Sequence, residues 1–225
     1  MMPRRGRVSV AIVDSGVHVP HPHLPAVAGG IAIDLQGMEH DDYTDRLGHG
    51  TAVASAIHEK APSAEIYAVK VFDDALATSV PTLVRAIDWA SERGMRLVNL
   101  SLGTPNDFRA EELAPAVERA IRRGTIIVSA FEHEGQTMYP GCMTGVVGVL
   151  LDWEQARESV RVSPDGVMVA SGYPRPIPGV PPERNLNGIS FAVANATGVL
   201  AAALAADPDR RSAAGALDAL RGHGA

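Results

Sequence analysis

Three polar residues stand at places in the chain where side chains could perform covalent chemistry. Asp14 directly follows the apolar run VSVAIV, residues 8–13. His49 lies between two glycines, at the start of a stretch rich in small residues. Ser190 stands at the start of an apolar run that extends to residue 206. A serine hydroxyl becomes a nucleophile when a histidine accepts its proton and a carboxylate orients that histidine.

Each of these residues also has an ordinary structural interpretation. An aspartate after a strand is commonly a turn former or a helix N-cap, and so is a serine before a helix. The glycines around His49 suit a simple turn as well as a closely packed site. The three residues therefore indicate a catalytic site only if the fold brings them together.

The apolar pattern alternates between strands and helices along the chain. Strand-like runs cover residues 8–13, 65–72, 96–103, 125–131 and 144–151, and helical patterns cover 50–60, 79–94, 110–124 and 189–206. This alternation predicts an α/β fold, a three-layer sandwich with a mostly parallel twisted sheet and helices on both faces. Residues 1–225 are expected to form a single domain. Sites form at the carboxyl ends of parallel strands, which is where Asp14 is expected.

Composition argues against several function classes. The chain has 225 residues, of which 46% are hydrophobic, and a net charge of −6, which argues against a nucleic-acid partner. Its single cysteine, Cys142, excludes an intramolecular disulfide and a cysteine-based zinc site. The apolar run that ends at Asp14 is too short for a signal peptide, and the alanine-rich run 198–206 is too short to span a membrane. We expect a cytoplasmic protein with no membrane partner, or a secreted one if a leader has been removed; no pattern indicates an oligomeric state.

The order Asp, His, Ser and the motifs around these residues resemble the subtilisin-like serine proteases, the subtilase family. DSGV followed by HPHL resembles the family's Asp motif, GHGTAVAS resembles its His-Gly-Thr-His box, and NGISFA resembles Asn-Gly-Thr-Ser-Met-Ala. APSAEIYAVKVF and AIDWASERGMRLVNLSLG align without gaps with the stretch that leads to the family's Ser-Leu-Gly segment. The resemblance covers most of residues 8–205.

The resemblance implies a serine endopeptidase that hydrolyses peptide bonds through an acyl-enzyme intermediate and takes peptide or protein substrates. Ser190 would be the nucleophile, His49 its base and Asp14 the carboxylate that orients His49. The backbone N–H of Ser190 would be one oxyanion donor. The chemistry requires no cofactor, no metal ligands are predicted, and a structural calcium ion is possible but not indicated.

The resemblance also implies a substrate groove. Ser101, Leu102 and Gly103 would pair their backbone with the substrate residues that precede the scissile bond. DDALATS, residues 73–79, would form the opposite wall. Leu76, Ala77 and Thr78 stand where the family often has glycines, so the outer pockets are expected to be narrow.

Two neighbouring positions depart from the family's pattern. His133 falls where the family has the asparagine that donates to the oxyanion, in a register supported by the following Glu134 and Gly135. His133 then either donates an N–H to the oxyanion or leaves the oxyanion hole incomplete. Glu132 falls where the family has a glycine that lines the pocket for the residue before the cut. If Glu132 faces that pocket, it predicts either a preference for Lys or Arg before the cut or a shallow pocket. The alternative is that the Glu132 side chain turns to solvent.

Milder departures lie around the two motifs, at Ile189, Ala194 and Asn195, and at Ala52, which replaces the second His of the His-Gly-Thr-His box. These changes alter packing more than chemistry.

Two other functions compete with the endopeptidase. A catalytically impaired subtilase fold, acting as a peptide-binding or scaffold protein, would show the same motifs. A metal-dependent hydrolase would draw ligands from HVPHPH, residues 18–23, and EHDDYTDRLGH, residues 39–49. We interpret both stretches as surface loops, with Asp41, Asp42 and Asp45 forming a solvated acidic patch. No G-x-G-x-x-G or P-loop follows a strand, which argues against nucleotide binding.

Overall fold

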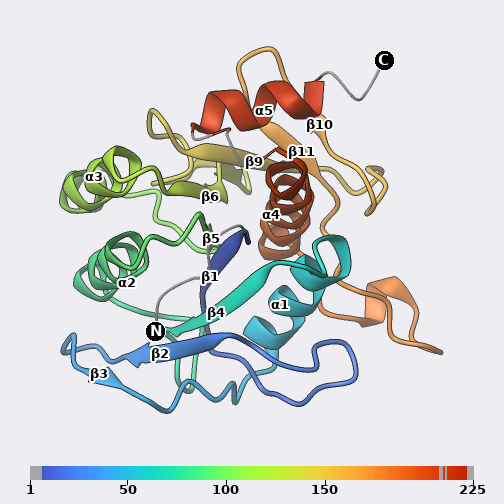
Figure 1. Ribbon diagram of the computed structural model, residues 1–225, viewed down its shortest axis with the longest axis horizontal. Coiled ribbons are helices and arrows are strands. Elements are labelled where there is room, and N and C mark those ends of the chain that lie inside the picture. Colours follow the sequence, from blue (N-terminus) through green and yellow to red (C-terminus); the bar gives the residue numbers. More distant parts are fainter. Residues whose placement is uncertain (1–6, 208–209, 211, 222–225) are drawn as a thin grey trace.

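The computed structural model describes residues 7–207, 210 and 212–221, and nine strands within these residues form one sheet (Figure 1). Its order is β10-β11-β9-β6-β5-β1-β4-β2-β3. The strands are β1 (Ser9–Asp14), β2 (Gly29–Ile33), β3 (Glu39–His40), β4 (Glu65–Lys70), β5 (Leu97–Leu100), β6 (Ile126–Ala130), β9 (Val147–Leu151), β10 (Arg161–Val162) and β11 (Met168–Ala170). All neighbours pair in parallel except at the two edges, where β3 and β10 are antiparallel.

Helices cover both faces of the sheet (Figure 1). The helices are α1 (His49–Lys60), α2 (Val80–Glu92), α3 (Asp107–Arg122), α4 (Ile189–Ala206) and α5 (Ala213–Arg221). Residues of α1, α4 and α5 share one hydrophobic core with one face of the sheet, and residues of α2 and α3 share a second core with the other face. The three-layer α/β sandwich expected from the sequence is confirmed.

The central strand β1 shows why the sheet lies between two cores. All six of its residues are buried. Val10 and Ile12 belong to the core beneath α1 and α4, whereas Ala11 and Val13 belong to the core beneath α2 and α3. Successive side chains of a strand point to opposite faces, so a strand buried on both faces is a continuous apolar run. Residues 10–13 are all apolar, and the polar side chain of Asp14 comes where the strand ends.

Helix α4 is apolar around most of its circumference. Its 18 residues have the length and hydropathy of a membrane span, and 61% of them are buried inside the protein. It packs against α1 and α5 and against β6, β9 and β11. A helix that is hydrophobic all round is buried in this way at the centre of a core.

The predicted strands and helices of the centre are all present, and their ends differ from the predicted ones by at most three residues. Helix α3 begins three residues earlier than its apolar pattern, because the Asn106 side chain accepts the backbone N–H groups of Phe108 and Arg109. Strand β5 ends at Leu100, which leaves residues 101–103 as a loop. The strands β2, β3, β10 and β11 were not predicted.

Candidate active site

Asp14 and His49 meet at the carboxyl end of β1. Asp14 is completely buried, and its Oδ1 lies 2.6 Å from Nδ1 of His49, the first residue of α1. The same oxygen accepts the backbone N–H of Ser15 at 2.8 Å. A hydrogen bond to a carboxylate places a proton on Nδ1 of the imidazole, which leaves Nε2 of the neutral ring able to accept a proton.

The glycine after His49 permits this close approach. A Cβ atom at Gly50 would lie 2.2 Å from the carbonyl oxygen of Gly16 and 3.2 Å from Cβ of Asp14. Only a residue without a side chain lets α1 begin against the loop that follows β1. Gly50 of the Gly-His-Gly motif is therefore a packing requirement of the Asp14–His49 pair.

Asp45 holds together the loop after β1 and the start of α1. Its Oδ1 accepts the hydroxyl of Ser15 at 2.8 Å, and its Oδ2 accepts the N–H and the hydroxyl of Thr51 at 2.8 and 2.6 Å. Helix α1 has no side-chain cap at Gly48, so Asp45 supplies the missing acceptor to its first turn.

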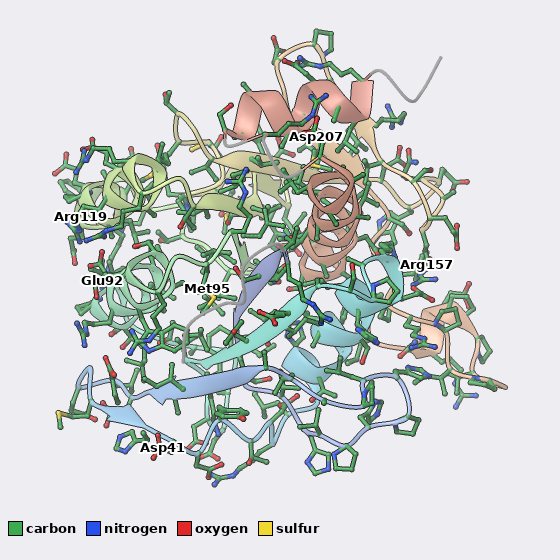
Figure 2. The ribbon with its side chains drawn as sticks, in the orientation of Figure 1. Asp41, Glu92, Met95, Arg119, Arg157 and Asp207 are labelled. Carbon is green, nitrogen blue, oxygen red and sulfur yellow. The ribbon has the colours of Figure 1, made fainter. Side chains whose placement is uncertain are left out.

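The interpretation of Asp45 as part of a solvated acidic patch is wrong, because its residue is only 7% exposed. Asp41 and Asp42 are exposed as expected, and Asp41 lies at the periphery of the molecule (Figure 2). A polar residue just before a helical pattern is a recognised start signal, and this signal could have identified Asp45.

Burial and hydrogen bonding shift the pKa values of this network in opposite directions. Burial lowers the pKa of His49, but the hydrogen bond and charge of Asp14 and the charge of Asp45 outweigh it, so the pKa is raised above its usual value. Burial raises the pKa of Asp45, but the hydrogen bonds from Thr51 and Ser15 outweigh it, so the pKa is lowered. Asp45 is therefore ionised at neutral pH.

Ser190 lies beside this pair as the second residue of α4. The His49 and Phe191 rings are 5.4 Å apart between centroids, which brings the start of α4 next to His49. The Ser190 hydroxyl donates to the carbonyl of Ser101 at 3.2 Å, and the Ser101 hydroxyl donates to the carbonyl of Ser190 at 3.4 Å. Within residues 7–207, no hydrogen bond joins Ser190 to His49. The N-cap interpretation of Ser190 is wrong, since the cap residue of α4 is Gly188 and no side chain caps the helix.

The predicted substrate segment, residues 101–103, is held by a buried polar network. The Asn99 amide donates to the Ser101 hydroxyl at 2.7 Å, and the Thr197 hydroxyl of α4 donates to Asn99 Oδ1 at 3.0 Å. Both Asn99 and Thr197 are completely buried. Leu102 and Gly103 are half-buried. The sequence analysis missed Asn99, although a polar residue inside a buried apolar strand must find hydrogen-bond partners.

Glu132 and His133 lie on a separate hairpin of β7 (Glu132–His133) and β8 (Gln136–Thr137). Its turn residues, Glu134 and Gly135, have φ values of 51° and 78°, as a type I′ turn requires. Both Glu132 and His133 are exposed. In the described part of the chain, no hydrogen bond or ion pair joins either side chain to Ser190. The oxyanion role of His133 and the pocket role of Glu132 therefore stay predictions.

The hairpin is tied to the substrate segment by one backbone bridge. Thr104 and Tyr139 exchange two N–H···O hydrogen bonds of 2.9 Å. The bridge joins the end of residues 101–103 to the chain just after β8. The hairpin that carries Glu132 and His133 is thus a neighbour of the predicted substrate segment.

Among the described residues, no group of three or more His, Cys, Asp or Glu side chains is arranged to hold a metal ion. The histidines and aspartates of residues 18–23 and 39–49 therefore give no support to the metal-dependent hydrolase. The expectation that the chemistry requires no cofactor stays a prediction.

Comparisons with known proteins agree with the motifs. The model of the subtilase family matches residues 5–149. Minor extracellular protease Epr of Bacillus subtilis (strain 168) is 32% identical over 186 residues, which are 74% of this chain and 28% of Epr. Subtilisin DY of Bacillus licheniformis is 30% identical over 224 residues, which cover 89% of this chain and 78% of subtilisin DY. The chain thus spans less than a third of Epr but most of subtilisin DY.

Solved structures share the fold. A lanthipeptide protease superposes with a TM-score of 0.71 over 95% of this chain and 79% of that protease, at 19% identity. A psychrophilic protease superposes with a TM-score of 0.70 over 96% of this chain and 83% of its own, at 22% identity.

Proposed function

Because this chain belongs to the subtilase family, we propose that it is a serine-type endopeptidase that hydrolyses peptide or protein substrates. Membership of the family supports serine protease activity in general. The assignment of individual residues rests on the motifs and on the geometry of the site. The buried 2.6 Å hydrogen bond between Asp14 and His49, with Ser190 alongside, is the observation that carries the proposal.

In the proposed reaction, Ser190 attacks the carbonyl carbon of the scissile bond while His49 Nε2 takes its hydroxyl proton. Asp14 keeps Nδ1 protonated and stabilises the imidazolium that forms. The tetrahedral intermediate collapses to an acyl-enzyme as His49 returns the proton to the leaving amine. Water then attacks the ester by the same route in reverse, which releases the acid product and restores Ser190.

The negative charge that develops on the substrate oxygen requires donors. Ser190 lies in the first turn of α4, where backbone N–H groups have no acceptor within the helix. Its N–H is the first donor that we propose, and a ring N–H of His133 is the second. His133 would have to reach the oxyanion from the exposed hairpin, which is a less preorganised arrangement than a buried donor.

The substrate would lie along residues 101–103 as an added strand, with its residues before the cut paired to this backbone. Its N–H groups would then compete with the Ser190 hydroxyl for the Ser101 carbonyl. The hydroxyl released in this way is free to turn toward His49. The cytoplasmic location expected from the sequence stays a prediction, since the relative Epr carries the word extracellular in its name.

A fluorophosphonate probe tests the nucleophile directly. We expect wild-type protein to be labelled and Ser190→Ala to remain unlabelled, because the probe reacts only with an activated serine. Ser101→Ala is a useful comparison, since its hydroxyl is close to Ser190 but has no base. Labelling of Ser190→Ala, or of neither protein, would contradict the assignment.

A catalytically impaired fold that binds peptides is the second candidate. Two observations favour it: the Ser190 hydroxyl donates to Ser101 instead of His49, and His133 is exposed. This candidate predicts peptide binding without turnover. Wild-type protein that binds an extended peptide but is not labelled by the probe would support it.

A further inference from the structure

A hollow lies beside the start of α1, and none of residues 101–103 lines it. It is a cavity of about 590 Å³ between the chain at residues 18–23, the start of α1 and the chain at residues 174–186. One of its lining residues, Gly48, directly precedes His49, and another, Leu186, lies four residues before Ser190. The cavity therefore lies beside the candidate active site, although neither His49 nor Ser190 lines it.

Small side chains of α1 form the floor of this cavity. Thr51, Ala52 and Ser55 line it. Ala52 stands where the subtilase pattern has its second histidine, and an imidazole at this position would occupy part of the space. The replacement of this histidine by Ala52, which the sequence suggested would alter packing, thus leaves space in the cavity.

The walls of the cavity carry hydrogen-bond donors. His18, His21 and His23 line one side and Arg175 lines the other. Burial and the nearby charge of Arg175 lower the pKa of His23, so its ring is neutral at neutral pH and still offers one N–H. Arg175 is two-thirds buried, with its Nη1 donating to the carbonyl of His23 at 3.0 Å.

The acidic groups near the cavity are engaged elsewhere. Asp45 lines it, but its two oxygens already accept hydrogen bonds from Ser15 and Thr51. Glu59 lies 3.8 Å from Arg175 but only 2.5 Å from Arg157, which is labelled at the edge of the molecule in Figure 2. The positive charge of Arg175 is consequently only partly neutralised.

The position of the cavity indicates which part of a substrate it receives. Ser101, which follows β5, contacts Ser190, whereas the cavity is lined by residues at the start of α1 and by none of residues 101–103. An extended peptide that pairs with residues 101–103 up to the scissile bond would continue across His49 into the cavity. The cavity would therefore hold residues of the leaving product.

We infer that this cavity selects substrates with an acidic side chain shortly after the scissile bond, whose carboxylate pairs with Arg175 and accepts N–H groups from His21 or His23. The inference rests on the proposed endopeptidase function and names its substrate class. Arg175 is the residue that determines this specificity, because a guanidinium binds a carboxylate with charge-assisted hydrogen bonds.

Matched peptides test the inference. We expect kcat/KM to be about tenfold higher for a quenched peptide with Glu at one of the first three positions after the cut than for the same peptide with Gln. Arg175→Gln should abolish the difference. The control Arg184→Gln removes an equal charge from an exposed residue on the same loop and should preserve it. Ala52→His should reduce the preference by filling the cavity.

A binding measurement separates this inference from the proposed function. The labelled product peptides, with Glu or Gln near their new amino terminus, are titrated into Ser190→Ala by fluorescence anisotropy. Tighter binding of the Glu peptide that is lost in the Ser190→Ala, Arg175→Gln double variant supports the inference even if wild-type protein cleaves nothing. Equal binding and equal cleavage of the Glu and Gln peptides would overturn it.

Discussion

The acid–base half of the candidate site is buried and fixed by many hydrogen bonds, whereas the hairpin proposed to complete the oxyanion hole is exposed. Asp14 and His49 sit at the ends of regular elements in the core, and Asp45 braces the loops around them. His133 lies in a strand of two residues next to a tight turn. The two halves of the proposed active site thus differ strongly in burial and in the number of hydrogen bonds that hold them.

This difference shows which part of the chemistry the fold itself determines. A buried carboxylate and imidazole must be paired, so their geometry follows from packing of the core. A donor on an exposed hairpin is free of this constraint, and such loops vary more easily. Substitutions at the residues that activate Ser190 are therefore expected to be poorly tolerated. Substitutions at the residues that stabilise the oxyanion are expected to be tolerated better.

The largest effect is expected at Asp14. Asp14→Asn keeps the size of the side chain but removes its charge, so His49 loses both its correct tautomer and the partner of its imidazolium. We expect kcat to fall about 10⁴-fold, the order known for this change in a serine protease triad, with KM little altered. Steady-state kinetics on one peptide measure both constants. Asp41→Asn, at an exposed position, is the control, and a loss below tenfold would contradict the role of Asp14.

A smaller effect is expected at His133. His133→Ala should lower kcat about 10²-fold, near the lower end of what removal of one oxyanion donor costs in subtilisin. His133→Asn should restore most of this loss, because its amide can donate in the same way. The control is Gln136→Ala, which alters the residue paired with His133 across the hairpin. Unchanged turnover in His133→Ala would remove His133 from the oxyanion hole.

The pH dependence of the wild-type protein tests the buried half. His49 must be neutral to accept a proton, and its pKa is raised above the usual 6.5. We expect kcat/KM to fall about tenfold per pH unit on the acid side, with a midpoint above 6.5. In Asp14→Asn the midpoint should move down, because burial remains while the carboxylate is gone. A wild-type midpoint at or below 6.5 would show that Asp14 does not act on His49 as proposed.

The smallest effect is expected at Glu132. An exposed carboxylate is screened by water and salt, so it should favour Lys or Arg before the cut by only about three- to fivefold. Glu132→Gln should remove this preference, and high salt should weaken it in the wild-type protein. A peptide-library cleavage profile measures the preference. A wild-type profile without preference for basic residues would indicate that Glu132 faces solvent.

The central elements were predictable because each carries its own signal. The apolar run of α4 is bounded by Gly188 and Asp207, and its predicted range agrees with the structure. Strand β1 is buried on both faces, and its residues 10–13 form an unbroken apolar run. Strands of two residues have no measurable periodicity, and this applies to β3, β7, β8 and β10. The strands with which they pair cannot be identified from the local sequence.

The motifs predict the residues of the candidate triad, whereas the residues that support the triad carry weaker sequence signals. Asp14, His49 and Ser190 stand in short patterns that belong to a family. Asp45 and Asn99 support the site through hydrogen bonds to residues that are distant in the sequence or that belong to other elements. The residues next to them in the sequence indicate these roles only weakly. The outward position of His133 follows from the hairpin turn, whose two positive φ values were not foreseen.

The opposite pKa shifts of His49 and Asp45 separate loss of activity from loss of structure. Asp45 has a lowered pKa in the folded chain, so its contribution to stability persists above about pH 3.8 and is lost only as the pH falls through the folded value. His49 has a raised pKa, so its contribution is fully present below about pH 6.5. Between about pH 3.8 and pH 6.5, His49 is protonated and cannot accept a proton from Ser190, while His49 and Asp45 both stabilise the fold. We therefore expect mild acid to protonate His49, and so to stop the proposed proton transfer, while the contributions of both groups to stability remain.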